Sequence, residues 1–144
     1  MSGTGILLQP DDYAQANRFA FGDSPALADE LLALVLAGTK TATCGALAHF
    51  GAGGEPLPEV GRQDVVLDGS GRPAAVIETI EVTIRRFDDV DAEFAHAEGE
   101  GDRSLAHWRR EHERYFRRNG GFALDMQLVC ERFRLVGRFE RDRG

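Results

Sequence analysis

The sequence predicts an α+β fold, in which a small β-barrel or strongly bent sheet has helices packed around it. Its 144 residues are enough to bury a core as a single domain. The expected elements run in the order of two helices, several strands, two helices and a last strand. Because strands and helices do not strictly alternate, this order disfavours a Rossmann-type sheet.

The first expected elements are two helices. Residues 11–20 are expected to form a short helix that places Tyr13, Ala16 and Phe19 on one side. A second, clearer helix is capped by Asp23 or Ser24, takes Pro25 in its first turn and ends at Gly38. Its apolar positions follow the 3.6-residue period and predict a buried face made of Leu27, Leu31, Leu34 and Val35.

The middle of the chain is expected to be rich in strands. Strands are expected over 41–46 and 62–67, the second followed by a turn at 68–71. Residues 73–86 continue the β pattern, and the Gly-rich residues 51–54 are typical of a surface loop. The alternation in 73–86 predicts one shared face for Val76, Ile80, Val82 and Ile84.

The C-terminal part is expected to hold two helices and a closing strand over 126–136. A short helix over 90–97 is followed by the acidic loop 98–102, whose Asp102 can cap a longer helix that runs to about Arg118. The side chains that this longer helix is expected to bury are Leu105, Trp108, His112, Tyr115 and Phe116.

Composition excludes several classes of protein. The 42% apolar and 28% charged content is ordinary for a soluble globular protein, and no apolar run approaches the roughly 20 residues of a membrane span. The N-terminus lacks the pattern of a secretory signal, so a cytoplasmic location is expected. Cys44 and Cys130 would be reduced thiols there. We expect no membrane partner and no cofactor.

The charge is distributed unevenly along the chain. The net charge is −7, with −12 over residues 1–102 and +5 over 103–144. An acidic body argues against duplex DNA as a partner, whereas the basic flank can hold a phosphate-bearing ligand. The alternative is a solvated helix face, in which these arginines pair with Glu111 and Glu113. Most of the flank is formed by Arg109, Arg110, Arg114, Arg117 and Arg118.

Lys40 is the only lysine, against sixteen arginines. Arg does not deprotonate in a protein, whereas the pKa of a partly buried Lys can shift toward neutrality, so that the amine acts as a base or nucleophile. A deprotonated Lys40 could activate the Thr43 hydroxyl, and a carboxylate of the 98–102 loop could hold the proton. The alternative is that Lys40 is retained by chance, that Thr43 is an ordinary strand residue, and that the 98–102 loop is a solvated turn.

No widely used catalytic motif is present, and no metal site is expected. His96, Glu98 and Glu100 alternate in a way that could ligate a divalent ion. An acidic loop is more often a solvated surface, because metal sites need several converging ligands.

Five segments, in order, resemble the ASCH domain family. The segment 38–43 matches its Gly-x-Lys-x-x-Ser/Thr signature. The resemblance covers most of the chain, so we expect a single ASCH domain over 1–144 with a core over about 19–136. The other matching segments are Phe21–Asp23, Pro58–Gly61, Glu98–Leu105 with Trp108, and Leu128–Phe133.

The resemblance implies a PUA-like small β-barrel flanked by helices, and a small-molecule nucleoside or RNA as partner. A short bacterial branch of the family hydrolyses the amide of N4-acetylcytidine with a Lys, a Thr and a Glu. These residues map onto Lys40, Thr43 and Glu100, with Glu98 as the alternative carboxylate. Another branch is linked to RNA cleavage. This chain is longer than the short amidohydrolases.

We therefore expect an ASCH-type amidohydrolase that acts on an N4-acylcytidine-like nucleoside. The alternatives are an RNA-binding module and a ribonuclease, in which Lys40 would contact phosphate or stabilise charge on phosphorus. The substrate-binding candidates besides Glu98 are Arg103, Ser104 and Arg132. Arg103 could equally pair with Asp102 at the surface, and Ser104, in the first turn of a helix, is more often a local backbone partner. Arg132, if it points inward, needs a buried partner, and the carboxylate of the site is one candidate.

Overall fold

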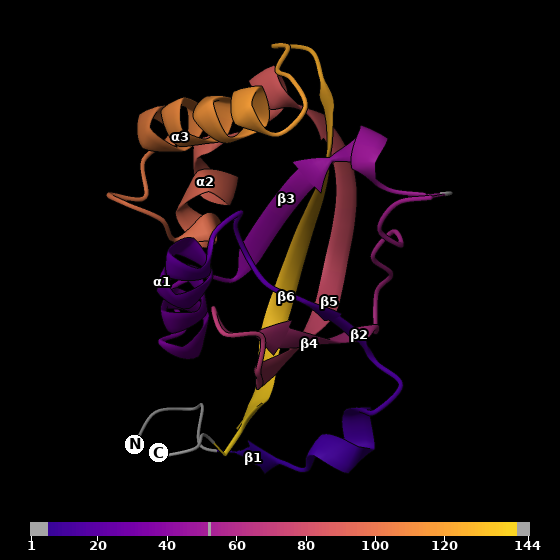
Figure 1. Ribbon diagram of the computed structural model, residues 1–144. Helices are drawn as coiled ribbons and strands as arrows, with labels where there is room; N and C mark the ends of the chain where they lie inside the picture. Colours follow the sequence, from indigo (N-terminus) through magenta and orange to yellow (C-terminus); the bar gives the residue numbers. More distant parts are fainter. Residues whose placement is uncertain (1–5, 52, 141–144) are drawn as a thin grey trace.

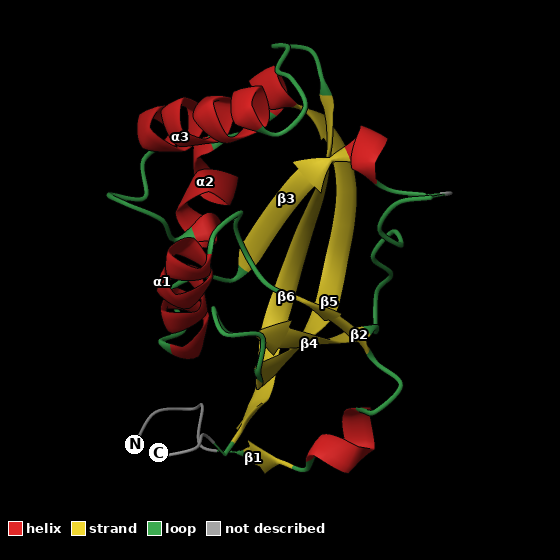
Figure 2. Ribbon diagram, in the orientation of Figure 1, coloured by secondary structure: helices red, strands yellow, loops and turns green. Residues whose placement is uncertain are grey.

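Residues 6–51 and 53–140 are described in the computed structural model. Their three α-helices lie along one side of a long curved sheet (Figure 1). The helices are α1 (Pro25–Leu36), α2 (Ala92–Glu98) and α3 (Leu105–Arg118). Figure 2 shows the remainder of the fold as strands, short 3-10 turns and connecting loops.

The sheet is mixed and curls into a half-barrel. Its described strands follow the order β1-β6-β5-β4-β2. The remaining strand, β3, pairs with residues 128–132 of β6. The β1–β6 and β2–β4 pairs are parallel, and the other pairs are antiparallel. The expected α+β small barrel flanked by helices is therefore confirmed. The strands are β1 (Leu7–Leu8), β2 (Asn17–Phe19), β3 (Ala42–Ala46), β4 (Gln63–Leu67), β5 (Pro73–Arg86) and β6 (Gln127–Phe139).

Two apolar clusters fix the helices against this sheet. One packs α2 and α3 on β3 and β6, through Phe94, Trp108 and Phe116. The other packs α1 on β4, β5 and β6, through Leu31 and Val35. The ends of α1 and α2 are thereby brought beside the start of β3, which is where the single lysine lies.

The helix boundaries follow local capping. Ser24 Oγ accepts from Leu27 N at the start of α1, as expected, whereas Leu27 itself is only half-buried. The cap of α3 is Ser104 and not Asp102, which instead accepts from Ser104 N. On α3, Trp108 and Phe116 are buried, and the other expected core positions are half-buried.

Two further expectations about the elements were wrong. Residues 11–20 form no α-helix: a 3-10 turn over Pro10–Tyr13 leads into β2, which is held by parallel pairing with β4. The predicted shared face of β5 is also broken, because the register shifts at Thr79/Glu81, where Ile80 has no partner on β6. A shift of register moves the following side chains to the other face. Ile80 and Ile84 are consequently about half exposed, at 50% and 48%.

No helix among the described residues combines the length and apolar character needed to cross a bilayer. Cys44 and Cys130 are free thiols that lie directly opposite each other on β3 and β6. Burial raises the pKa of both thiols, that of Cys130 to about 12.

Candidate functional site

Lys40 lies in the tight connection between α1 and β3. The backbone N–H of Lys40 donates to Leu34 O at the end of α1, and Thr41 N donates to Ala97 O in α2. Gly99 ends α2 with φ 77, and a Cβ there would lie 2.5 Å from Thr39 O. This close approach needs glycine, and it encloses the Lys40 side chain, which is only 2% exposed.

The Lys40 ammonium is held between two carboxylates. Its Nζ lies 2.9 Å from both Glu98 Oε1 and Glu100 Oε2, and it also donates to Ala42 O at 2.9 Å. Burial alone would lower the pKa of the amine, but the two glutamates outweigh it and raise that pKa. Lys40 is therefore a cation in the resting protein, which corrects the expectation of a deprotonated base.

Glu98 is enclosed and fully occupied by protein contacts. Its Oε1 binds Lys40, and its Oε2 accepts from Trp108 Nε1 at 2.9 Å and lies 3.4 Å from His112 Nε2. Burial opposes ionisation, yet the charges of Lys40 and His112 hold the pKa of Glu98 far below its usual range. With 1% of its side chain exposed, Glu98 positions Lys40 and has no oxygen left for a ligand.

His112 is a second cation of the site. Its Nδ1 lies 2.9 Å from the Trp108 carbonyl and its Nε2 faces the Glu98 carboxylate, so both ring nitrogens meet acceptors. Only the doubly protonated ring can donate in both directions. Burial would lower the pKa of His112, but Glu98 outweighs it and raises that pKa. The ring also stacks on Trp108, with centroids 4.3 Å apart.

A pocket of about 290 Å³ opens beside this cluster. Lys40, Thr43, Glu98 and Glu100 all line it. The Glu100 side chain is 23% exposed, so it is the accessible carboxylate of the pair around Lys40. Within the described part of the chain, the Thr43 hydroxyl forms no hydrogen bond and is free to meet a ligand.

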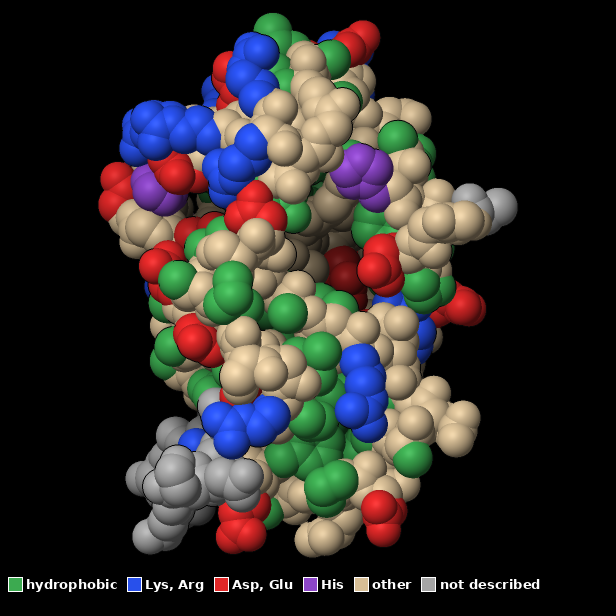
Figure 3. Space-filling model, viewed as in Figure 1, with side chains coloured by type: hydrophobic (Ala, Val, Ile, Leu, Met, Phe, Trp, Pro, Cys, Tyr) green, Lys and Arg blue, Asp and Glu red, His purple; other side chains and the backbone are tan. Residues whose placement is uncertain are grey.

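A second pocket, of about 240 Å³, adjoins the first. The residues that line both pockets are Phe21, Gly22, Thr43, Cys44 and Tyr115. Thr43 therefore lies on the boundary between the two. The face drawn in Figure 3 is hollowed near its centre, with acidic side-chain atoms inside the hollow.

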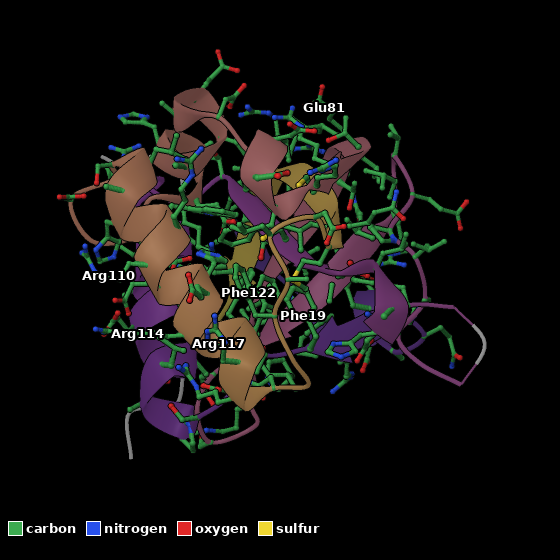
Figure 4. The ribbon with its side chains drawn as sticks, turned by 90° about the horizontal axis from the view of Figure 1, so that it is seen from above. Phe19, Glu81, Arg110, Arg114, Arg117 and Phe122 are labelled. Carbon is green, nitrogen blue, oxygen red and sulfur yellow. The ribbon has the colours of Figure 1, made fainter. Side chains whose placement is uncertain are left out.

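Three residues expected to bind substrate line neither pocket. Arg103 donates to His96 O and Thr39 O, and so fastens the connection that holds Lys40. Ser104 caps α3. Arg132 pairs with Glu81 and Glu93 at 3.0 and 3.2 Å. Figure 4 shows Glu81 away from α3, so this pair lies outside the site.

Sequence reasoning missed the two groups that hold Glu98 in place. Trp108 is expected to be a core residue, and it is buried. Its indole N–H also donates a hydrogen bond to Glu98. His112 follows four residues later on the same helix. A tryptophan and a histidine at i and i+4 on one buried face both need polar partners, and this was the available signal.

Three side chains could in principle gather round a metal ion. One ligand atom each of Cys44, Glu98 and His112 lie within 4.8 Å of one another. The Lys40 ammonium on the same carboxylate repels a further cation, and the raised pKa of Cys44 keeps its thiol protonated. His96, considered from the sequence, is exposed and faces Arg103. These charges do not suit a divalent cation.

The basic flank is largely compensated by nearby acids. Arg114 pairs with Glu111 at 3.1 Å and Arg117 with Glu113 at 2.9 Å along α3. Arg118 reaches Asp23 at 2.6 Å. In Figure 4, Arg110 and Arg114 lie along the outer side of α3, pointing away from the sheet.

Comparison with known proteins finds one matching family model and similar solved structures. The family model described as the ASCH domain matches residues 17–137. The crystal structure of an ASCH domain from Lactobacillus crispatus JV V101 is 31% identical, with a TM-score of 0.78 over 90% of this chain and 86% of that one. A crystal structure from Enterococcus faecalis V583, assigned to family DUF984, is 36% identical, with a TM-score of 0.77 over 90% and 85%. No curated protein matches the sequence.

Proposed function

The chain belongs to the ASCH domain family, and from this premise we propose that it hydrolyses the exocyclic amide of an N4-acylcytidine-like nucleoside. One observation carries the proposal. The Lys40 ammonium is held between Glu98 and Glu100 in the wall of a pocket that Thr43 also lines. A nucleophile, an accessible carboxylate and a fixed positive charge are the groups that acyl transfer needs.

The first half of the reaction forms an ester. The Thr43 oxygen attacks the acyl carbonyl carbon while Glu100 takes the hydroxyl proton. The Lys40 ammonium, whose protons are directed at protein oxygens, stabilises the oxyanion on the carbonyl oxygen through its nearby positive charge and not through a hydrogen bond. The bond between carbon and the exocyclic nitrogen then breaks, and that nitrogen receives the proton from Glu100. Cytidine leaves, and the acyl group stays on Thr43.

The second half restores the enzyme. A water molecule gives a proton to Glu100 and attacks the ester carbonyl carbon. The ester bond breaks, the proton passes to the Thr43 oxygen, and a carboxylic acid is released. Every proton taken up by Glu100 is returned within the same half-reaction.

Lys40 acts here as a cation and not as a base. Glu98, itself held by Trp108 and His112, keeps the ammonium charged and fixed. A preorganised charge in a dry site costs little reorganisation when the oxyanion forms.

An RNA-directed function has less support. Four of the five arginines that would form an RNA-facing surface are paired with Glu111, Glu113 or Asp23. A lysine that is 2% exposed is also poorly placed to reach the phosphates of a strand lying on the surface.

The test is hydrolysis of N4-acetylcytidine, followed by chromatography of the released cytidine. We expect Glu100→Gln and Thr43→Val each to lower kcat by roughly 100-fold or more. Glu113→Gln, which removes a half-buried glutamate of α3 that lines neither pocket, is the matched control and should leave kcat unchanged. Wild-type protein without turnover, or full turnover in both variants, would refute the proposal.

A further inference from the structure

Apart from Thr43, which lines both pockets, the residues of the pocket that adjoins the Lys40 site have no part in the chemistry proposed above. Its walls carry the rings of Phe21, Phe50 and Tyr115. Gly45, on β3, keeps the Phe50 ring close: a Cβ at this position would lie 3.1 Å from it. Aromatic walls suit a flat ligand with its own π face.

Glu131 presents an unused carboxyl oxygen to this pocket. Its Oε2 accepts a hydrogen bond from Thr79 Oγ1. In the described ranges of the chain, its Oε1 has no hydrogen-bond partner and no cation pairs with it. Burial raises the pKa of this carboxyl above its ordinary value and Asp64 adds to the rise, against the opposing effects of the Thr79 hydrogen bond and of Arg62. A protonated Oε1 would donate a hydrogen bond to a ligand.

Arg62 and Asp64 complete the polar part of the pocket. The two terminal nitrogens of Arg62 donate hydrogen bonds to Asp64 Oδ2 and to Leu57 O, each at 2.9 Å. Asp64 is only 2% exposed, yet its Oδ1 has no partner among the described residues, and neither has Arg62 Nε. Buried polar atoms are nearly always hydrogen-bonded, so these two atoms leave hydrogen-bonding capacity unused beside the pocket.

The strand register sets the distance from this pocket to the nucleophile. Thr43 on β3 lies directly opposite Glu131 on β6. Side chains of such a pair share one face of the sheet, with Cβ atoms about 4.5–5.5 Å apart. A ring held by Glu131 would therefore carry its substituent beside the Thr43 hydroxyl.

We propose that the pocket formed by Arg62, Asp64 and Glu131 binds the pyrimidine ring of the substrate and holds its exocyclic amide against Thr43. Glu131 Oε1 donates to the unprotonated ring nitrogen next to the amide-bearing carbon, and the Arg62 guanidinium suits the ring carbonyl. The identity of the ring rests on the proposed function. The same contacts discriminate against uridine, whose corresponding ring nitrogen carries a proton and cannot accept.

The experiment measures the dissociation constant of unmodified cytidine by titration calorimetry, which needs no turnover. Glu131→Gln keeps a donor beside an acceptor and should bind within about threefold of wild type, whereas Glu131→Leu should bind roughly tenfold more weakly. Glu81→Gln, on the exposed part of β5, is the control and should bind like wild type. Wild-type protein should also prefer cytidine to uridine by about tenfold.

The outcomes separate this inference from the proposed function. Cytidine binding with this pattern but no hydrolysis of N4-acetylcytidine would support the pocket and refute the hydrolase. Hydrolysis with unchanged kcat/KM in Glu131→Leu would refute the pocket and leave the hydrolase standing. No cytidine binding, or equal binding of cytidine and uridine by wild type, would overturn the inference without any variant having to fold.

Discussion

At the scale of single residues, the geometry around Lys40 explains why this position alone is a lysine. The ammonium directs its three protons at oxygens of Ala42, Glu98 and Glu100, all at 2.9 Å. A guanidinium is planar and longer, and its fork cannot converge on three acceptors around one atom. The compositional preference for arginine is therefore opposed here by shape as well as by chemistry.

Removing the Lys40 charge should destabilise the protein. Lys40→Met leaves Glu98 ionised and buried with one cation fewer, and breaking a buried pair in this way costs about 3–5 kcal/mol. The free energy of unfolding in urea measures this cost. The double variant Lys40→Met/Glu98→Gln removes the stranded charge and should recover part of the loss. A Lys40→Met protein as stable as wild type would contradict the charge assignment.

The protonated state of His112 predicts a pH dependence of stability. Its pKa is raised in the folded protein above the ordinary value of 6.5, because Glu98 outweighs burial. The contribution of His112 is therefore complete below pH 6.5 and is lost as pH rises through the folded pKa. We expect the free energy of unfolding to fall over that window.

His112→Gln should abolish this fall, as followed by urea unfolding at a series of pH values. His107→Gln, on the same helix, is the matched control and should retain the fall. An unchanged pH profile in the His112 variant would show that the imidazolium does not stabilise the fold.

At the scale of elements, the sequence predicts the elements that carry local signals and misses those that depend on long-range pairing. Helix α1 has a serine cap, a proline in its first turn and a 3.6-residue period, so its position followed from the sequence alone. The short β2 has no such signal, because it is held by a parallel partner 47 residues away in the sequence. The β5 face was missed because a register shift at Thr79/Glu81 interrupts a regular alternation.

The same division applies to the candidate site. The lysine count and the family signature led to Lys40, Thr43 and Glu100, which all line one pocket. The charge of Lys40 depends on how closely α2 approaches β3, and this distance cannot be predicted from the sequence of either segment. The contact of His112 with Glu98 depends likewise on the packing of α3 against α2.

The turn at Gly99 controls this approach and can be tested directly. Gly99→Ala combines a left-handed φ of 77 with a Cβ 2.5 Å from Thr39 O, so the connection that holds Lys40 must move. We expect a loss of about 2–4 kcal/mol in unfolding free energy, together with a loss of turnover.

Gly38→Ala is the matched control, because Gly38 has a similar φ of 82 but open space around its Cβ position. It should cost only about 1 kcal/mol and leave turnover nearly unchanged. Equal effects of the two variants would mean that the close approach to Thr39 has no part in shaping the site.

At the scale of the whole molecule, ion pairs reduce the basic surface that the charge asymmetry of the sequence implies. Residues 103–144 carry +5, but arginines of α3 pair within the helix and with Asp23. The outward basic surface is thus reduced, while the pockets open among acidic and aromatic side chains. This arrangement favours a small uncharged ligand over a phosphate backbone.

Salt dependence tests this view of the whole molecule. Hydrolysis of a free nucleoside, which carries no phosphate, should change little between low and high salt. The triple variant Arg109→Gln/Arg110→Gln/Arg114→Gln should retain wild-type kcat/KM, because these arginines line neither pocket. For single-stranded RNA, each neutralised phosphate contributes about −0.7 to the slope of log K against log salt. A measured slope steeper than about −3, flattened by about two units in the triple variant, would instead establish α3 as an RNA-binding face.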